Sequence, residues 1–325
     1  MPSNPSTEIN LRSNPPTKIN LFNVDFTDRD RARASFGPPR LNLKLPGFIW
    51  DFLPNGNDLM EETSIAVAQA LRSFIYLECI ILNLALNDFS DTCIRHLSEN
   101  LMQRQRAHHL SLGWGSIDVT EHGVVEFGNC LLNLPQLTKL QFYLPSEFEL
   151  EFACARALSR GLRIVSGLQA LKLAVASCNI DDHYIAELSQ GLAHLSQLNT
   201  INLNFNQTNV GAQGIQALTA ALSILSRLID ARLSFEHNTM DVASLGCLAS
   251  WIVCSHELRR VLVNLSMCAL EIDTIHTFQM SSGASSLEVF GTPKHVAFTT
   301  EVVPELNFKL QNIDFSDGDR ARASF

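Results

Sequence analysis

The chain repeats one short pattern of apolar positions along most of its length. The first, fourth and sixth residues of the pattern are apolar, as at Leu198, Ile201 and Leu203, and Asn206 follows three residues later. Apolar residues two apart predict a strand with one buried face. Eight copies recur about every 30 residues, and a degenerate ninth is expected at 287–290. The eight copies begin at Gly47, Cys79, Ala107, Leu137, Leu168, Leu198, Leu228 and Leu258.

The second half of the repeat interval predicts a helix. Apolar residues three and four apart indicate one buried helix face. The predicted helical segments are 89–101, 117–131, 180–195, 210–225 and 242–253. Near four of their starts stands a short side-chain acceptor that can satisfy free backbone N–H groups. These acceptors are Asp91, Asp118, Asp181 and Asn209.

Strand and helix in alternation at a fixed period predict a one-dimensional stack. One strand–helix unit cannot bury its own apolar face, but stacked units share a continuous core. The helix is wider than the strand, so we expect the stack to curve with its strands on the concave side. The fold class is therefore α/β: a solenoid of about eight repeats, with parallel strands on one face and helices on the other. Asn206, Asn87 and Asn55 are expected to bridge adjacent coils.

The repeated L-x-x-L-x-L-x-x-N pattern resembles the ribonuclease-inhibitor-like leucine-rich repeat family. The resemblance covers residues 45–290, and the pattern departs from it at 144–151 and after Met267. It implies a horseshoe-shaped leucine-rich-repeat solenoid that serves as a binding scaffold. That family also includes activators of the small GTPase Ran, which typically carry a long acidic C-terminal tail. The tail here is short and ends in Arg-Ala-Ser-Phe, which argues against that role.

Two polar flanks, 1–44 and 291–325, are expected to bracket the solenoid at 45–290. Residues 3–11 and 13–21 form a short tandem, and the Asp-Arg-Ala-Arg-Ala-Ser-Phe segment that ends at Phe36 returns, with its lead-in, at the C-terminus. Terminal repeats are often atypical because they cover the exposed core, so caps are one interpretation and docking peptides the other. Ser35 and Ser324 follow Arg-Ala and match the pattern of basophilic kinase sites.

Composition narrows the class of protein. With 46 % hydrophobic and 18 % charged residues, the chain is expected to fold around a large core, which excludes disorder. A net charge of −9 disfavours nucleic-acid binding by phosphate neutralisation. The acid excess favours, weakly, a partner with a basic surface.

No apolar stretch has the length of a signal peptide or a membrane span, and the eight scattered cysteines predict buried, reduced thiols. We therefore expect a soluble cytoplasmic protein, with the nucleus left open.

Sequence motifs for catalysis or cofactor binding do not occur. There is no nucleotide-binding glycine motif, no nucleophile elbow and no His-Glu-x-x-His pair. The best metal-like clusters, 108–109 and 181–183, lack partners at ligand spacing. We expect neither an enzyme nor a cofactor or metal site.

The candidate binding residues lie between the inward apolar positions of the predicted strands, where side chains point to the concave face. Tyr and Arg are enriched at binding hot spots, so Tyr143, Lys172 and Arg232 come first. The other concave-face candidates are Gln141, Asn202 and Asn204. Trp114, just past its strand, is read either as an anchor at the rim or as a filler of the coil interior.

The sequence predicts a non-catalytic scaffold or adaptor that binds protein through this face and the flanks. Membership of a larger assembly fits the same reading. Two alternatives stay open: a regulator of a small GTPase, and a substrate receptor of a ubiquitin-ligase complex. No recruitment domain such as an F-box is evident for the second. The partner's identity is not readable from the sequence.

Overall fold

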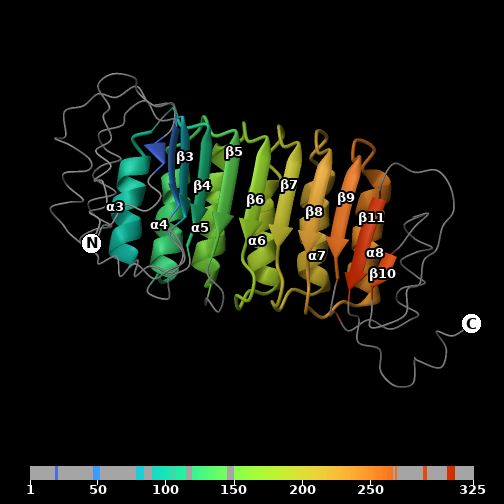
Figure 1. Ribbon diagram of the computed structural model, residues 1–325. Helices are drawn as coiled ribbons and strands as arrows, with labels where there is room; N and C mark the ends of the chain where they lie inside the picture. The colour runs from blue at the N-terminus through green and yellow to red at the C-terminus, as the bar shows by residue number, and fades with distance from the viewer. Residues whose placement is uncertain are drawn as a thin grey trace, which may run out of the picture.

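One parallel sheet and one layer of helices make up the computed structural model (Figure 1). It describes residues 19–20, 47–51, 78–83, 90–104, 106–114, 119–144, 150–265, 268, 288–290 and 306–311. The strands are β1 Ile19–Asn20, β2 Gly47–Asp51, β3 Cys79–Asn83, β4 His109–Gly113, β5 Lys139–Tyr143, β6 Ala170–Ala174, β7 Thr200–Asn204, β8 Asp230–Ser234, β9 Arg260–Asn264, β10 Glu288–Phe290 and β11 Leu306–Gln311. The helices are α3 Asp91–Leu101, α4 Glu121–Leu131, α5 Phe152–Ile164, α6 Asp182–Leu192, α7 Ala212–Ser223 and α8 Val242–Cys254.

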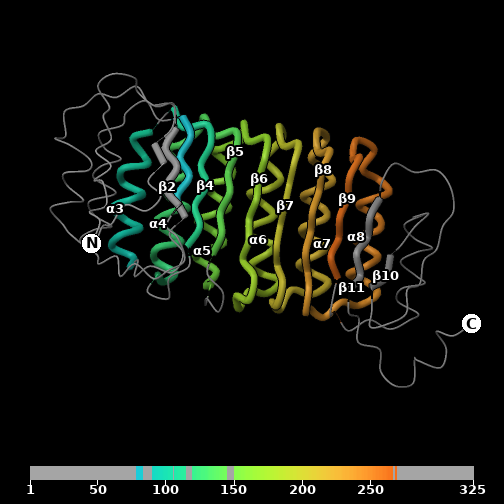
Figure 2. Tube along the Cα trace, in the orientation of Figure 1, coloured from blue at the N-terminus to red at the C-terminus, as the bar shows by residue number. Residues whose placement is uncertain are grey.

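The sheet is parallel throughout and follows the chain from β1 to β9 (Figure 2). Each repeat strand pairs with the next in a register of about 30 residues; Leu171 stands opposite Ile201, which stands opposite Ala231. Parallel neighbours need a crossover, and a helix supplies it between every pair from β3 to β9. The predicted α/β leucine-rich-repeat solenoid is confirmed.

The register of the first two copies differs from the predicted one. The pattern aligned Leu82 and Leu84 with Leu110 and Leu112, but the sheet places Ile80 and Leu82 opposite that pair. The same two-residue shift holds for β2, where Phe48 and Trp50 pair with Ile80 and Leu82. A slip of two residues leaves every side chain on the same face of a strand. The alternation alone therefore cannot distinguish the two registers.

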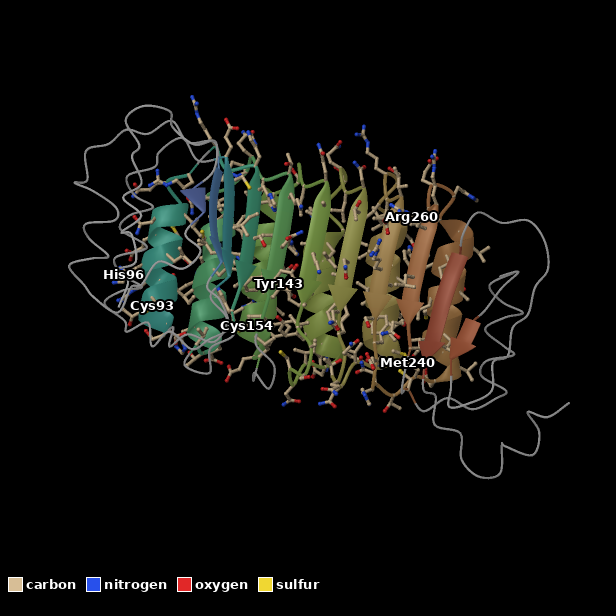
Figure 3. All side chains as sticks on the ribbon, viewed as in Figure 1. Cys93, His96, Tyr143, Cys154, Met240 and Arg260 are labelled. Atoms are coloured by element: carbon tan, nitrogen blue, oxygen red, sulfur yellow. The ribbon has the colours of Figure 1, made fainter. Side chains whose placement is uncertain are left out.

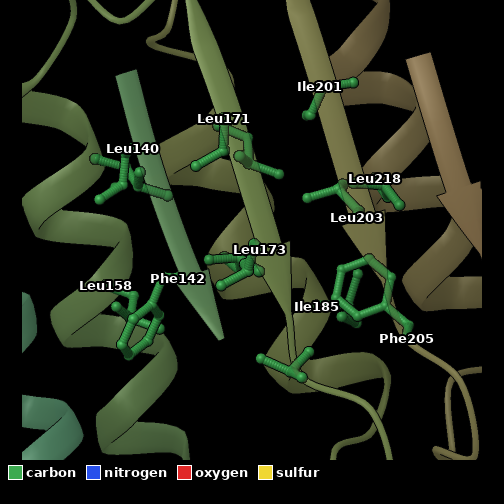
Figure 4. Close-up of a cluster of buried hydrophobic side chains, with 14 of the residues drawn as sticks. Leu140, Phe142, Leu158, Leu171, Leu173, Ile185, Ile201, Leu203, Phe205 and Leu218 are labelled. Atoms are coloured by element: carbon green, nitrogen blue, oxygen red, sulfur yellow. The ribbon is translucent and has the colours of Figure 1, made fainter. Parts of the chain in front are cut away.

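The core lies between the sheet and the helices and is built from columns of aliphatic residues. The strands contribute Leu140, Leu171, Ile201 and their neighbours, all fully or nearly fully buried, and the helices contribute residues such as Ile185 and Leu218 (Figure 4). Stacked rings extend this core: Phe205 and Phe235 from successive coils lie 5.8 Å apart between centroids. Each coil thus covers the apolar face of its neighbour, as the repeat predicts.

Helices pack closely at small residues. An added Cβ at Gly161 of α5 would meet the Gly128 carbonyl oxygen of α4 at 2.7 Å and Leu131 Cβ at 2.8 Å. At Gly191 of α6 it would meet the Ser159 carbonyl oxygen at 2.6 Å. Glycine at these positions lets the adjacent helices approach each other closely.

The turns after the strands carry polar links between coils. Asn206 Oδ1 accepts a hydrogen bond from the Glu236 backbone N–H at 2.9 Å, as predicted for a bridging asparagine. Asp181 caps α6 by accepting from the Tyr184 N–H at 3.0 Å, which confirms its predicted place at a helix start. Asp91 acts across coils and accepts from the Gly123 N–H of α4 at 3.1 Å. Asn55, Asn87 and Asp118 lie outside the described residues.

Segments near both ends of the chain add strands to the sheet. β1 pairs with β2, while β11 lies beside β9 and β10 lies outside β11. The degenerate copy expected at 287–290 therefore forms a strand, β10. In the sheet, however, β11 lies between β10 and β9. Ser35, Ser324 and the matched Arg-Ala-Ser-Phe ends lie outside the described residues, and the division into 1–44, 45–290 and 291–325 stays a prediction. No helix within the described part of the chain is long and apolar enough to cross a membrane.

Candidate functional site: the strand face

The helices cover one side of the sheet, and the other side carries the outward-pointing side chains of β3–β9, which we call the strand face (Figure 3). Register places these side chains in rows across the strands. The central row contains Gln141, Lys172, Asn202 and Arg232 on β5 to β8. Arg232 is exposed and the other three are half-buried. The sequence thus placed this row on the correct face, although its role in binding stays a prediction.

A shallow hollow of about 320 Å³ lies in the middle of the strand face. Long side chains stand around it, and short ones such as Ala170 and Thr200 form its floor, since they leave space between the larger residues. Its lining residues are Lys139, Leu140, Gln141, Ala170, Leu171, Lys172, Thr200, Asn202, Asp230 and Arg232. Four of the candidates predicted from sequence therefore border one depression: Gln141, Lys172, Asn202 and Arg232.

Lys172 and Tyr143 form a pair at one side of the hollow. The Lys172 ammonium nitrogen lies 5.0 Å from the centre of the Tyr143 ring, within the range of a cation–π contact. This contact holds the ammonium group in place while leaving it at the surface. Asn204, in the row of Tyr143, accepts a hydrogen bond from the Asn206 N–H at 3.0 Å, so its side-chain oxygen is already engaged in the turn.

Asp230 organises the opposite side of the hollow. Its side chain is only 9 % exposed, and its carboxylate lies 2.7 Å from Arg260 Nη2 and 3.6 Å from Arg232 Nε. The two arginine side chains remain 62 % and 53 % exposed. A buried carboxylate requires such partners, and the arrangement fixes both guanidinium groups at the surface.

His109 adds no positive charge to this face at neutral pH. Its imidazole is partly buried beside Cys79, with 3.2 Å between Nδ1 and Sγ. Burial, and then the nearby charge of Lys139, lower the pKa of His109 below its ordinary value. Lys139 is thus the cation at this corner of the strand face.

Trp114 does not lie at the rim, so its prediction as a partner anchor is wrong. It is 4 % exposed. Its ring packs edge-on against Phe142 and Phe127, with centroids 4.8 and 5.6 Å away. The indole fills the coil interior, and the backbone N–H of Trp114 donates to the Tyr143 carbonyl oxygen at 2.9 Å.

The outward-pointing residues at the first position of each strand were not among the residues predicted from sequence. Lys139, Asp230 and Arg260 are three of these residues, and two of them line the hollow. The alternation that placed Gln141 and Arg232 outward also applies two residues earlier, at 139 and 230. Extending the alternation to the first strand position would have found them.

Three buried thiols are unsuited to nucleophilic chemistry. Burial raises the pKa of Cys130 and of Cys154 to about 12 and that of Cys268 to about 11. All eight cysteines lie within the described residues and none forms a disulfide: Cys79 and Cys247 are partly buried, five are buried, and Cys254 is exposed. Among the described residues, no group of three or more His, Cys, Asp or Glu side chains is arranged to hold a metal ion.

The architecture defines the class of protein: parallel strands in continuous register, each followed by a helix on the same side, form a leucine-rich-repeat solenoid. No protein-family model and no curated protein matches the chain. Among solved structures, internalin C2 of Listeria monocytogenes is 13 % identical with a TM-score of 0.34, over 65 % of this chain and 70 % of that one. A Bacteroides fragilis protein is 10 % identical with a TM-score of 0.35, over 74 % and 67 %.

Proposed function

We propose that the chain is a non-catalytic scaffold that binds a protein partner across its strand face. The observation that carries this proposal is the uncovered central row of the sheet. There, Gln141, Lys172, Asn202 and Arg232 border one hollow that the helix layer leaves open. Amide, cationic and aromatic groups on a rigid support suit the recognition of protein side chains. The raised pKa values of Cys130 and Cys154 support a role without thiol catalysis.

We place the chain, within the leucine-rich repeats, nearest the ribonuclease-inhibitor-like type. A full α-helix of 11 to 13 residues follows each strand from β3 to β8, which supports that assignment. Cysteines without disulfides are usual in a reducing compartment, so eight cysteines of which none forms a disulfide support an intracellular location. No observation favours GTPase regulation or a ubiquitin-ligase role over general protein binding.

The test is affinity purification from the native source with matched variants. The strand-face variant is Tyr143→Ala with Arg232→Ala, and the control is Phe152→Ala with Arg160→Ala. The control also removes one aromatic residue and one arginine, here from exposed positions on the helix layer. We expect the strand-face variant to lose partners that wild type and control both recover, as quantified by mass spectrometry. Equal recovery by all three proteins contradicts the proposal.

A further inference from the structure

The strand face has the opposite charge to the chain that carries it. The whole chain has a net charge of −9. In the seven strands β3–β9 the cationic side chains are Lys139, Lys172, Arg232 and Arg260, and the one carboxylate is Asp230. With His109 neutral, the strand face carries three net positive charges. The net charge of the whole chain favours a partner with a basic surface. A basic partner does not suit the strand face, because this face is itself positively charged.

Asp230 offsets only one of the four positive charges of the strand face. Its carboxylate is buried between Arg232 and Arg260, whereas both guanidinium groups keep more than half of their surface in water. The ion-pair contacts within the described residues involve neither Lys139 nor Lys172. All four cations can therefore still meet an incoming anion.

The spacing of the cations is set by the sheet. Lys172 on β6 and Arg232 on β8 stand in the same row, with Asn202 on β7 between them. Adjacent strands lie about 4.8 Å apart, so the two side chains start about 10 Å from each other. The short side chains of Ala170 and Thr200 stand in the neighbouring row, between Lys139 and Asp230, and they also line the hollow. Asn202, Gln141 and Thr200 add neutral hydrogen-bond donors around it.

We infer that the hollow binds an acidic segment of a protein partner, with one carboxylate at Lys172 and a second at Arg232. This inference rests on the proposed function and specifies the chemistry of the partner. The Lys172 ammonium, held over Tyr143, and the Arg232 guanidinium, held by Asp230, are positioned before the ligand arrives. Side chains that are already ordered lose less freedom on binding.

A peptide fits this face better than a nucleic acid does. Nucleic-acid affinity comes mainly from neutralising many phosphates, whereas this face has four cations on a chain of net charge −9. Two discrete carboxylates on a short segment match two separate cationic positions.

The experiment selects ligands from a random library of twelve-residue peptides on the immobilised full chain. We expect the recovered peptides to be enriched in Asp and Glu over the starting library. A fluorescent peptide from this pool should then bind the variant Lys172→Gln with Arg232→Gln about tenfold more weakly than wild type. The control, Arg156→Gln with Arg160→Gln on α5, removes the same charge from the helix layer and should retain wild-type affinity.

Three results would overturn the inference. The first is a recovered pool without acid enrichment. The second is equal affinity of the selected peptide for wild type and for the strand-face variant. The third is displacement of that peptide by a single-stranded oligonucleotide of equal net charge at a lower concentration. If the native partner is still lost with Tyr143→Ala and Arg232→Ala, the scaffold stands and only the acidic chemistry fails.

Discussion

Asn238 joins two successive coils through a buried side-chain amide. Its Nδ2 donates to the carbonyl oxygens of Phe205 at 2.6 Å and Phe235 at 2.9 Å. Its Oδ1 accepts from the Thr208 N–H at 3.1 Å and the Thr208 hydroxyl at 2.8 Å. Asn238 is 4 % exposed, so water cannot replace these bonds, and both coils depend on one side chain.

Replacing Asn238 with alanine should destabilise the fold by about 3 kcal/mol, because a buried polar group without a partner costs about 1–3 kcal/mol. The measurement is urea unfolding of both proteins. The matched control is Asn209→Ala, which removes one hydrogen bond between exposed side chains, to Asn179 at 2.8 Å. The control should stay within about 0.5 kcal/mol of wild type. Similar losses for both variants would contradict the assigned role of Asn238.

The sequence identified one coil-bridging asparagine and missed the other. Asn206 was visible because it completes the L-x-x-L-x-L-x-x-N pattern. Asn238 lies two positions further along its own repeat, in a run of polar residues that reads as a surface turn. Asn238 is buried because the turn folds back over the core, and this cannot be predicted from the local sequence pattern. Thr208, 30 residues earlier, is also buried, and a search for polar columns at the repeat period would have found both.

Helix spacing is limited by glycine at specific contacts. Gly161 faces the Gly128 carbonyl of the preceding helix, while an added Cβ at Gly246 of α8 would meet nothing within 4 Å. The two positions have the same residue type in the same kind of element. Substituting alanine at both positions therefore distinguishes the effect of packing between helices from the effect of helix propensity.

Gly161→Ala should destabilise the protein by about 1–3 kcal/mol, because α4 and α5 must move apart to accept the methyl group. Gly246→Ala should stabilise it by about 0.5–1 kcal/mol, because alanine favours the helix and meets open space. Thermal or urea unfolding measures both. A stabilising Gly161→Ala would show that the two helices are not held at this distance.

Element type followed from sequence more readily than element register. Period-two and period-3.6 patterns placed the eight repeat strands β2–β9 and five of the six described helices. The helix α5 follows the departure at 144–151 and was not among the predicted segments. β2 and β3 were shifted by two residues, since such a slip leaves Ile80 and Leu82 inward and Ile81 outward. Only pairing with the next strand fixes the choice.

At the scale of the whole molecule, the fold is a row of coils in which each contacts its neighbours. Contacts run between consecutive helices and adjacent strands. Stability in such a stack is a sum of coil and interface terms, so a local defect spreads only a short way. The candidate site spans β5 to β8, and its geometry therefore depends on four adjacent coils.

Hydrogen exchange followed by mass spectrometry should show this locality. In Gly161→Ala, we expect amides of β4 to β6 to exchange faster, while those of β8 and β9 keep nearly wild-type protection. The reason is that only neighbours of the strained interface lose packing. A uniform loss of protection across all described strands would indicate that the stack opens as one cooperative unit instead.

Every strand of the stack points the same way, so the two long edges of the molecule differ. The edge where strands begin carries Arg227, Arg259 and Arg260 together with Glu78 and Glu257, and the edge where helices begin carries Asp91, Asp181 and Asp241. Fields of this kind guide an approaching charged molecule before contact and weaken as salt is added. We therefore expect the proposed acidic partner to approach from the strand-start edge. The arrival rate, more than the lifetime of the complex, will respond to ionic strength.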